Sequence, residues 1–405
     1  MADTLLDEDR TTAPAGNAPG PSRRVDAPAT VLLADPSRFT APYDAGLAEG
    51  LLANGAKVVF AVRPLRKGEA EELPPGTASP MFYRRFDQPG RLPGKLQKIA
   101  KALSHVAGLA RLMATARRLD ADVVHFQWAV IPIFDVVAMW LLKRSRPVVM
   151  TVHDTVPFNG EKISLFQNLG FDMPIRLADK VIVHTAQAKQ ALLDRGLPGG
   201  KITIIPHGPL AMKAEVATPR VRKDTDPVVL TLFGQLKPYK GVDLLVEAVA
   251  KVADRLRGRA KIVVAGAAHM DLGPIEEAIA AKGLGDIIDL RIGRLSDEAM
   301  ADLFDETDGF LFPYRQIDAS GVFFLTMPLG KWMIASRLGV FGEHITPGET
   351  GTLLPPGNVD ALAEALVEMT DKRLAPTGRG AFSTWAEIGA MTLRLYDEAK
   401  AERRR

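Results

Sequence analysis

The sequence predicts an α/β protein built from two doubly wound, Rossmann-like domains that face each other across a cleft, followed by a C-terminal helix. Short runs rich in valine, isoleucine and leucine alternate with longer segments of helical periodicity from residue 29 onward. This alternation stops near residue 209 and restarts near residue 228. Because the short runs are continuously apolar, we expect parallel sheets that are covered on both faces. Open α/β sheets bind ligands beyond the carboxyl ends of their strands, so the site is expected between the domains.

The first domain is expected over residues 29–210. Its predicted strands are 30–34, 57–62, 122–126, 147–152, 180–184 and 201–205, and its predicted helices are 43–54, 94–118, 131–143 and 186–195. Charged residues and proline accumulate at 211–226, which we interpret as a linker.

The second domain is expected over residues 227–380. Its predicted strands are 228–233, 261–265, 287–292 and 309–313, and its predicted helices are 241–256, 274–282, 296–305, 323–329 and 358–370. Within 381–405, apolar residues recur at intervals of three and four from Trp385 to Tyr396. This spacing predicts an amphipathic helix that docks on the rest of the chain.

The composition excludes several classes of protein. The 51 basic and 48 acidic residues give a formal charge of +3, too balanced for a protein that coats nucleic acid, so no nucleic-acid partner is expected. The absence of cysteine excludes disulfides, thiol catalysis and cysteine-ligated metals.

Two segments are considered as a secretion signal or a membrane-spanning helix, and neither fits. Residues 1–28 lack the apolar core of a secretion signal and are expected to be a disordered tail. The most apolar helical candidate, 129–142, contains Asp135 and falls short of the roughly 20 apolar residues that cross a bilayer. We therefore expect a cytoplasmic protein.

A loop with two glycines and two lysines follows the first strand of the second domain. Residues 233–241 read Phe-Gly-Gln-Leu-Lys-Pro-Tyr-Lys-Gly and include Lys237 and Lys240. Ammonium groups and backbone N–H groups at a helix start suit a phosphate. A helix-entry loop with solvated lysines explains the spacing equally well. The segment is neither a P-loop nor a dinucleotide fingerprint, which argues against a P-loop NTPase and a standard dehydrogenase.

A second candidate anion site lies at residues 316–322, Gln-Ile-Asp-Ala-Ser-Gly-Val, before a predicted helix. There Ser320, Gly321 and Val322 would present backbone N–H groups to a diphosphate, with Asp318 beside them for sugar hydroxyls. The alternative is that Ser320 is only an N-cap.

His153 and Asp154 end the fourth predicted strand and should point into the cleft, where a histidine can donate to a hydroxyl or phosphate. A purely structural role for this histidine is the alternative. His125 is expected in the core, and His207 is expected to shape the turn into the linker. The seven scattered histidines predict no metal site.

Taken in order, six motifs resemble those of the retaining GT-B glycosyltransferases of family four, the glycosyl transferases group 1. They are His153-Asp154, Ile205-Pro-His-Gly208, 233–241, Pro313-Tyr-Arg315, Ser320-Gly-Val322 and 348–356, and the resemblance spans about 29–396. It implies the GT-B architecture and transfer of a sugar, with retained configuration, from a nucleotide diphosphate-sugar to a hydroxyl of a glycan or lipid-linked glycan. It also implies a role in surface polysaccharide or glycoconjugate biosynthesis, with no metal and no cofactor beyond the donor itself.

The resemblance also implies roles for single residues. Lys240 is similar to the family's diphosphate-binding lysine. Lys237 replaces the usual arginine, because Gln235 occupies one place where that arginine is often found. His153 resembles the donor-contacting histidine, and residues 320–322 match the diphosphate cradle. His153, Asp318 and Lys240 form the expected catalytic set.

One departure keeps alternatives open. Many members carry two glutamates on the segment that follows residue 316. The first maps to Asp318, and the second falls on Leu325 or Thr326, neither of which is acidic. A non-catalytic nucleotide-sugar-binding relative, a sensor or scaffold, is one alternative. A GT-B epimerase of nucleotide sugars is another.

The acceptor side carries a basic segment. Nine basic residues and one acid, Asp87, lie between Arg84 and Arg118, and Lys95, Lys98 and Lys101 alternate there with apolar residues. Such a basic amphipathic helix suits peripheral contact with an anionic membrane, at its inner face, and a lipid-linked acceptor. A solvated helix with its apolar face on the core is the alternative.

Overall fold

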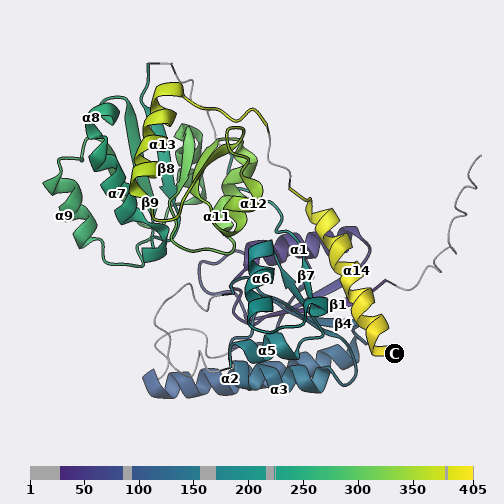
Figure 1. Ribbon diagram of the computed structural model, residues 1–405. Coiled ribbons are helices and arrows are strands. Elements are labelled where there is room, and N and C mark those ends of the chain that lie inside the picture. The colour runs from purple at the N-terminus through teal and green to yellow at the C-terminus, as the bar shows by residue number, and fades with distance from the viewer. Residues whose placement is uncertain are drawn as a thin grey trace, which may run out of the picture.

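The computed structural model describes residues 28–84, 94–155, 170–215, 223, 225–378 and 382–404, without the side chains of residues 94 and 95. Residues 1–27 of the expected tail and 216–222 and 224 of the expected linker lie outside the described residues. Two lobes are apparent in Figure 1, each with a central sheet and flanking helices.

The first lobe holds a seven-stranded sheet in the order β3-β2-β1-β4-β5-β6-β7, with all neighbouring strands parallel. Its strands are β1 (Thr30–Asp35), β2 (Lys57–Val62), β3 (Ala78–Pro80), β4 (Val123–Phe126), β5 (Val148–Thr151), β6 (Lys180–Val183) and β7 (Ile202–Ile204). Its helices are α1 (Ala41–Ala53), α2 (Gly94–Arg118), α3 (Pro132–Leu142), α5 (Asp172–Leu177), α6 (Ala186–Asp194) and the 3₁₀ turn Gly199–Lys201.

The second lobe holds a six-stranded parallel sheet in the order β10-β9-β8-β11-β12-β13. Its strands are β8 (Val228–Phe233), β9 (Ala260–Gly266), β10 (Ile288–Ile292), β11 (Gly309–Phe312), β12 (Trp332–Ser336) and β13 (Gly351–Leu354). Its helices are α7 (Val242–Lys251), α8 (Ala253–Leu256), α9 (Gly273–Ala281), α10 (Asp297–Glu306), α11 (Gly321–Thr326), α12 (Gly339–His344) and α13 (Val359–Lys372), with 3₁₀ turns Pro238–Lys240 and Met327–Leu329.

Both sheets are covered on both faces, as the continuous apolar runs predict. In the first domain α2, α3, α5 and α6 pack on one face and α1 on the other. In the second, α7, α9 and α13 cover one face and α10, α11 and α12 the other. The expected two-domain α/β architecture is confirmed.

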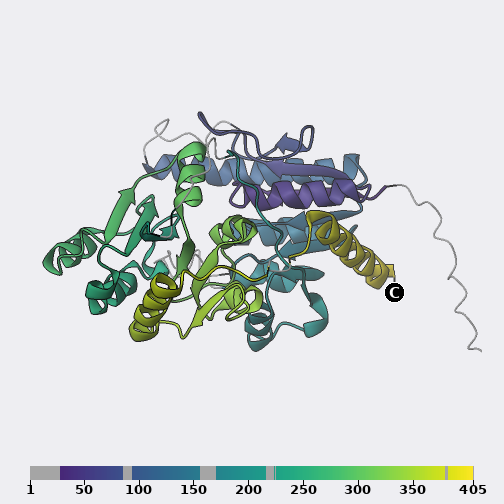
Figure 2. The ribbon, with the colours of Figure 1, turned by 90° about the horizontal axis from the view of Figure 1, so that it is seen from above.

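The C-terminal helix α14 (Trp385–Arg404) returns to the first domain and packs beside α1 (Figures 1 and 2). The two backbones come so close that a Cβ on Gly389 would lie 2.2 Å from the carbonyl carbon of Gly50. The Trp385 indole N–H donates to the carbonyl of Pro209, at 2.8 Å. The predicted docking helix is therefore confirmed, and its partner is the first domain.

Candidate functional site

A cavity of about 700 Å³ lies between the domains, at the carboxyl ends of both sheets; we call it the interdomain cavity. The first domain contributes the segments after β1, β4 and β5, and the second contributes those after β8 and β11. The lining residues are Phe39, Thr40, Pro42, Tyr43, Trp128, Ala129, Val130, Pro132, His153, Asp154, Phe171, His207, Leu210, Gln235, Lys237, Tyr239, Ala319 and Gly321. Four site residues from the sequence analysis are thus brought together: His153, Gln235, Lys237 and Gly321.

Lys240 belongs to the same loop as Lys237 but is not among the lining residues. Its side chain is almost fully buried, at 3% exposure, and its Nζ donates to the carbonyl of Phe233 at 2.9 Å. Burial, together with the charge of Lys237, lowers the pKa of Lys240 to about 7. Within the described part of the chain no carboxylate pairs with its ammonium group. A bound anion would stabilise the protonated form of such a buried amine, because opposite charges attract strongly where water is excluded.

The loop that carries the two lysines is held against the segment that follows β11. Gly241 has φ of 71°, and a Cβ there would lie 2.2 Å from the carbonyl oxygen of Pro313, so a side chain cannot be accommodated. The Arg315 guanidinium donates two hydrogen bonds to the Asp243 carboxylate, of 2.8 and 2.6 Å. The position of Lys240 is therefore set by backbone geometry and not by a flexible loop.

Residues 318–322 follow β11, and Asp318 meets the segment that follows β5. Ser320 Oγ accepts from the backbone N–H of Phe323 at 3.3 Å and so caps α11, as the structural alternative expects. Gly321 is exposed on the interdomain cavity. Asp318 Oδ2 accepts from both the N–H and the hydroxyl of Thr155, each at 2.5 Å. The described contacts of Asp318 thus join the two domains, and neither Asp318, Ser320 nor Val322 is among the lining residues.

His153 is a neutral member of a ring stack. Its Nε2 lies 3.1 Å from Gln127 Oε1, and its ring stacks on Trp128 with centroids 5.3 Å apart. Burial, with further contributions from neighbouring histidines, lowers the pKa of His153 well below its usual range. This side chain therefore acts as a hydrogen-bonding group and not as a cation.

His125 and His207 lie as the sequence analysis expected. His125 is fully buried, and its ring nitrogens are 2.7 Å from the Tyr396 and Thr151 hydroxyls. His207 Nδ1 donates to the Gly208 carbonyl at 2.6 Å, which shapes the turn.

Two family descriptions match the chain. Residues 45–208 match Glycosyltransferase Family 4, and residues 227–372 match Glycosyl transferases group 1. The chain belongs to the group 1 GT-B glycosyltransferases of family-four type.

Relatives of this glycosyltransferase transfer sugars. It is 28% identical over 318 residues to the MMP alpha-(1->4)-mannosyltransferase of Mycolicibacterium hassiacum, a match that covers 72% of this chain and 74% of that protein. It is 24% identical to the Phosphatidyl-myo-inositol mannosyltransferase of Mycobacterium leprae, over 69% of this chain and 74% of that one.

Solved structures confirm the GT-B fold. Alr3699/HepE of Anabaena, in complex with UDP and glucose, is 16% identical with a TM-score of 0.61 over 91% of this chain and 97% of that chain. The catalytic domain of Starch Synthase IV from Arabidopsis thaliana, bound to ADP and acarbose, is 13% identical with a TM-score of 0.66 over 93% and 100%.

In this glycosyltransferase Asp154 lines the interdomain cavity, as the sequence analysis expected, although it was not placed in the catalytic or donor-binding set. Burial, reinforced by the negative charge of Asp318, raises the pKa of Asp154 to about 7, against the opposing effect of Lys237. Its place beside His153 at a strand end was the available sequence signal. Trp128 and Tyr43 were missed, because only the folded chain shows that both rings contact His153.

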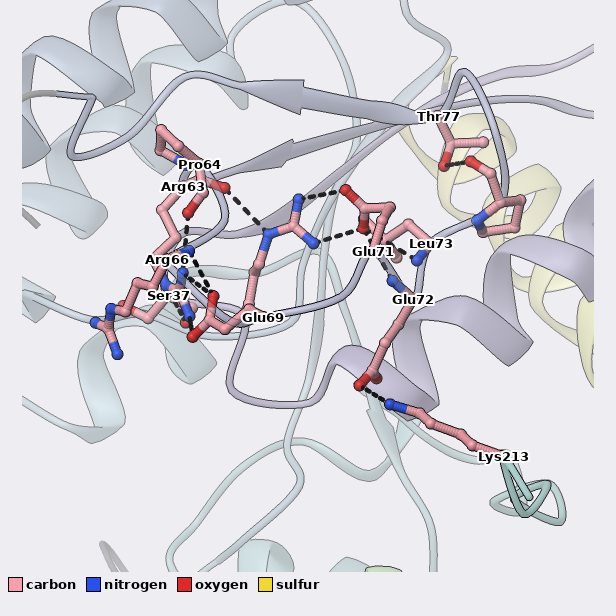
Figure 3. Close-up of polar contacts among 12 residues, drawn as sticks. Ser37, Arg63, Pro64, Arg66, Glu69, Glu71, Glu72, Leu73, Thr77 and Lys213 are labelled. Atoms are coloured by element: carbon pink, nitrogen blue, oxygen red, sulfur yellow. Dashed lines mark hydrogen bonds and ion pairs between the residues drawn. The ribbon is translucent and has the colours of Figure 1, made fainter. Parts of the chain in front are cut away.

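The first domain's wall of the interdomain cavity is braced by ion pairs around the loop 63–77, which follows β2 (Figure 3). Three pairs have closest N–O distances of 2.6, 2.7 and 2.6 Å: Arg38–Glu71, Arg63–Glu69 and Lys213–Glu72. Arg63 Nε also donates to the carbonyl of Ser37 at 3.1 Å. This network holds the short segment 37–40 in place, and Phe39 and Thr40 of that segment line the cavity.

The predicted acceptor-side lysines lie on α2, outside the cavity lining. Lys98 is exposed and Lys101 is partly buried, while the side chain of Lys95 lies outside the described residues. In the described part of the chain no helix is long and apolar enough to cross a membrane. Nor do any three histidine, aspartate or glutamate side chains described here gather into a metal site.

Proposed function

We propose that this glycosyltransferase is a retaining, metal-independent enzyme that moves a sugar from a nucleotide diphosphate-sugar to a hydroxyl of a glycan or lipid-linked glycan. The mannosyltransferase relatives and the UDP complex of the Anabaena protein support this donor class. We place the reaction in surface polysaccharide or glycoconjugate biosynthesis, in the cytoplasm, with peripheral contact to an anionic membrane.

The proposed chemistry is electrostatic. The bond between the anomeric carbon and the diphosphate oxygen breaks, and the acceptor oxygen forms the new bond on the same face of the sugar. The acceptor proton passes to a diphosphate oxygen, so no protein base is required. Lys240, Lys237 and the backbone N–H groups of residues 320–322 stabilise the departing charge, because fixed positive groups in a dry site cost little reorganisation.

The domains supply the remaining roles in this proposal. His153 and Gln235 contact the donor from opposite sides of the cavity, whose lining includes both. Asp318 sets the closed spacing of the domains through Thr155 and so positions the donor sugar. The single observation that carries the proposal is the buried amine of Lys240, whose pKa is lowered by burial and by Lys237. Its described hydrogen bond goes to the backbone carbonyl of Phe233.

The experiment is donor turnover followed by product stereochemistry. The purified protein is incubated with nucleotide sugars that bind it, and free sugar or glycoside is read by proton NMR. Retained anomeric configuration in the first product formed, without added metal and in the presence of a chelator, is the expected result. Inverted configuration, or turnover abolished by the chelator, would overturn the proposal.

A non-catalytic sensor or scaffold is the second candidate. It is favoured by the positions of the missing glutamate, where Leu325 and Thr326 lie inside α11 and Thr326 donates back to the Val322 carbonyl at 3.0 Å. Tight donor binding without slow donor hydrolysis or transfer would identify that candidate.

A further inference from the structure

Helix α3 leaves a stripe of large apolar side chains in solvent. Ile133, Phe134, Val137 and Trp140 are between 40% and 53% exposed, although the opposite face of α3 is buried in the first domain's core. Burying one such side chain is worth about 1.5–3 kcal/mol, so four exposed together make an unusual surface.

Helix α2 presents a second stripe beside it. Leu96, Ile99, Leu103 and Val106 are between 40% and 67% exposed. The helices run side by side along the outer edge of the first domain in Figure 1. A buried hydrogen bond joins them, between His105 Nε2 and Asp135 Oδ1 at 2.7 Å. We call these eight exposed side chains on the two packed helices the α2–α3 apolar surface.

The exposed charges along α2 and α3 are basic. No acidic residue occurs between Asp87 and Asp120, and the only acid of α3 is the buried Asp135. Lys98 is exposed on α2, and the guanidinium of Arg144 lies 3.4 Å from the ring centroid of Trp140. A tryptophan with a cation against its ring is typical of side chains at a membrane interface.

The surface continues to the mouth of the interdomain cavity. Val130 and Pro132, at the start of α3, line that cavity. Met173, which is 50% exposed, has its sulfur 3.3 Å from the position a Cβ on Gly170 would take, and Pro132 lies 3.8 Å from the same position. Apolar groups therefore extend from the cavity wall to the outer helix faces.

We propose that the α2–α3 apolar surface docks on an anionic lipid bilayer and holds the mouth of the interdomain cavity at the level of the lipid headgroups. This inference rests on the proposed function, and it assigns the acceptor to molecules anchored in that bilayer. Anionic lipid fits better than a second copy of the chain, since two copies would bring two basic faces together. Each basic group near the headgroups strengthens the contact, and salt weakens it.

The first test is flotation with vesicles of phosphatidylcholine, with and without about 30% phosphatidylglycerol. The wild-type protein should float only with the anionic vesicles, and less at high salt. The variant Val137→Ser/Trp140→Ser should lower the partition coefficient at least tenfold. Lys98→Glu should lower it about fivefold or more. Ile292→Ser and Lys282→Glu, at exposed positions of the second domain, should stay within twofold of the wild type.

The second test locates the cavity mouth. The chain has no cysteine, so a single introduced thiol can be labelled with an environment-sensitive dye. Labels at Val137→Cys and Met173→Cys should shift their emission to the blue with anionic vesicles, whereas one at Ile292→Cys should not. A shift at residue 292 alone, or at none of the three, overturns the proposed orientation.

The outcomes separate this inference from the proposed function. Flotation that is absent or unchanged in the α3 variant, or a concentration-dependent dimer abolished by that variant, overturns the docking surface. If nucleotide-sugar binding persists in that case, the proposed function still stands. Flotation as expected without any nucleotide-sugar binding contradicts the proposed function and leaves the surface intact.

Discussion

Replacing Lys240 by methionine separates the two consequences of burying an ammonium group at the donor site. The pKa of Lys240 is lowered from 10.5 to about 7. Since one pKa unit corresponds to about 1.4 kcal/mol, that burial costs the free protein at most about 4 kcal/mol at neutral pH. The lost hydrogen bond to Phe233 offsets about 1 kcal/mol of the relief. The variant should therefore unfold at higher urea concentration than the parent, with a gain of about 1–3 kcal/mol.

Turnover should change in the opposite direction. Removing one preorganised group that stabilises a developing anion costs about 10²–10³ in kcat, or about 3–4 kcal/mol. The matched control is Lys331→Met, because Lys331 also holds backbone carbonyls of the second domain, at 2.5–2.9 Å, but lies outside the cavity lining. That control should lose stability and keep kcat. If Lys240→Met turned over within a few-fold of the parent, the diphosphate role of Lys240 would be refuted.

Three further predictions concern pH and packing. Donor affinity should fall above about pH 7, because Lys240 loses its proton there in the free protein. Calorimetry in buffers of different ionisation enthalpy should report that donor binding takes up a proton. A pH-independent affinity would argue against Lys240 as a diphosphate-binding group. Gly389→Ala should lower the urea-unfolding free energy by about 1–3 kcal/mol, whereas Gly285→Ala, with open space around it, should change little. Arg63 lowers the pKa of Glu69 from 4.5 to about 2, so the pair's stabilisation is complete above pH 4.5 and lost as the pH falls toward 2. Glu69→Gln should therefore lose less stability than the parent on acidification, and equal losses in urea titrations would contradict this.

The fold could be predicted because its strands are locally distinctive. The predicted bounds of 57–62 and 228–233 agree with β2 and β8, whose residues are almost all apolar. Three strands were not predicted: β3, β12 and β13. β3 is only three residues long and ends in proline, and β13 begins with glycine and threonine, so neither has a periodic signal. The predicted single helix 241–256 is two helices, because Val252 leaves the helical conformation.

The site could be predicted in part for the same reason. His153, Lys237 and Gly321 follow strands whose carboxyl ends meet, so their convergence needed only the topology. The contact between Asp318 and Thr155 could not be predicted, because it depends on how far the two domains close on each other. The stacking of His207 on Phe324 of the second domain, with ring centroids 3.9 Å apart, could not be predicted for the same reason.

The central claim is that the interdomain cavity binds a nucleotide diphosphate-sugar. The most direct measurement is a thermal-shift screen of the purified protein against UDP, GDP, ADP and their common sugars. A ligand present at 100 times its dissociation constant stabilises the native state by about 2.7 kcal/mol, which gives a clear rise in Tm. We expect such a rise with one nucleotide series and its loss in Lys240→Met. No rise with any of them would contradict the account.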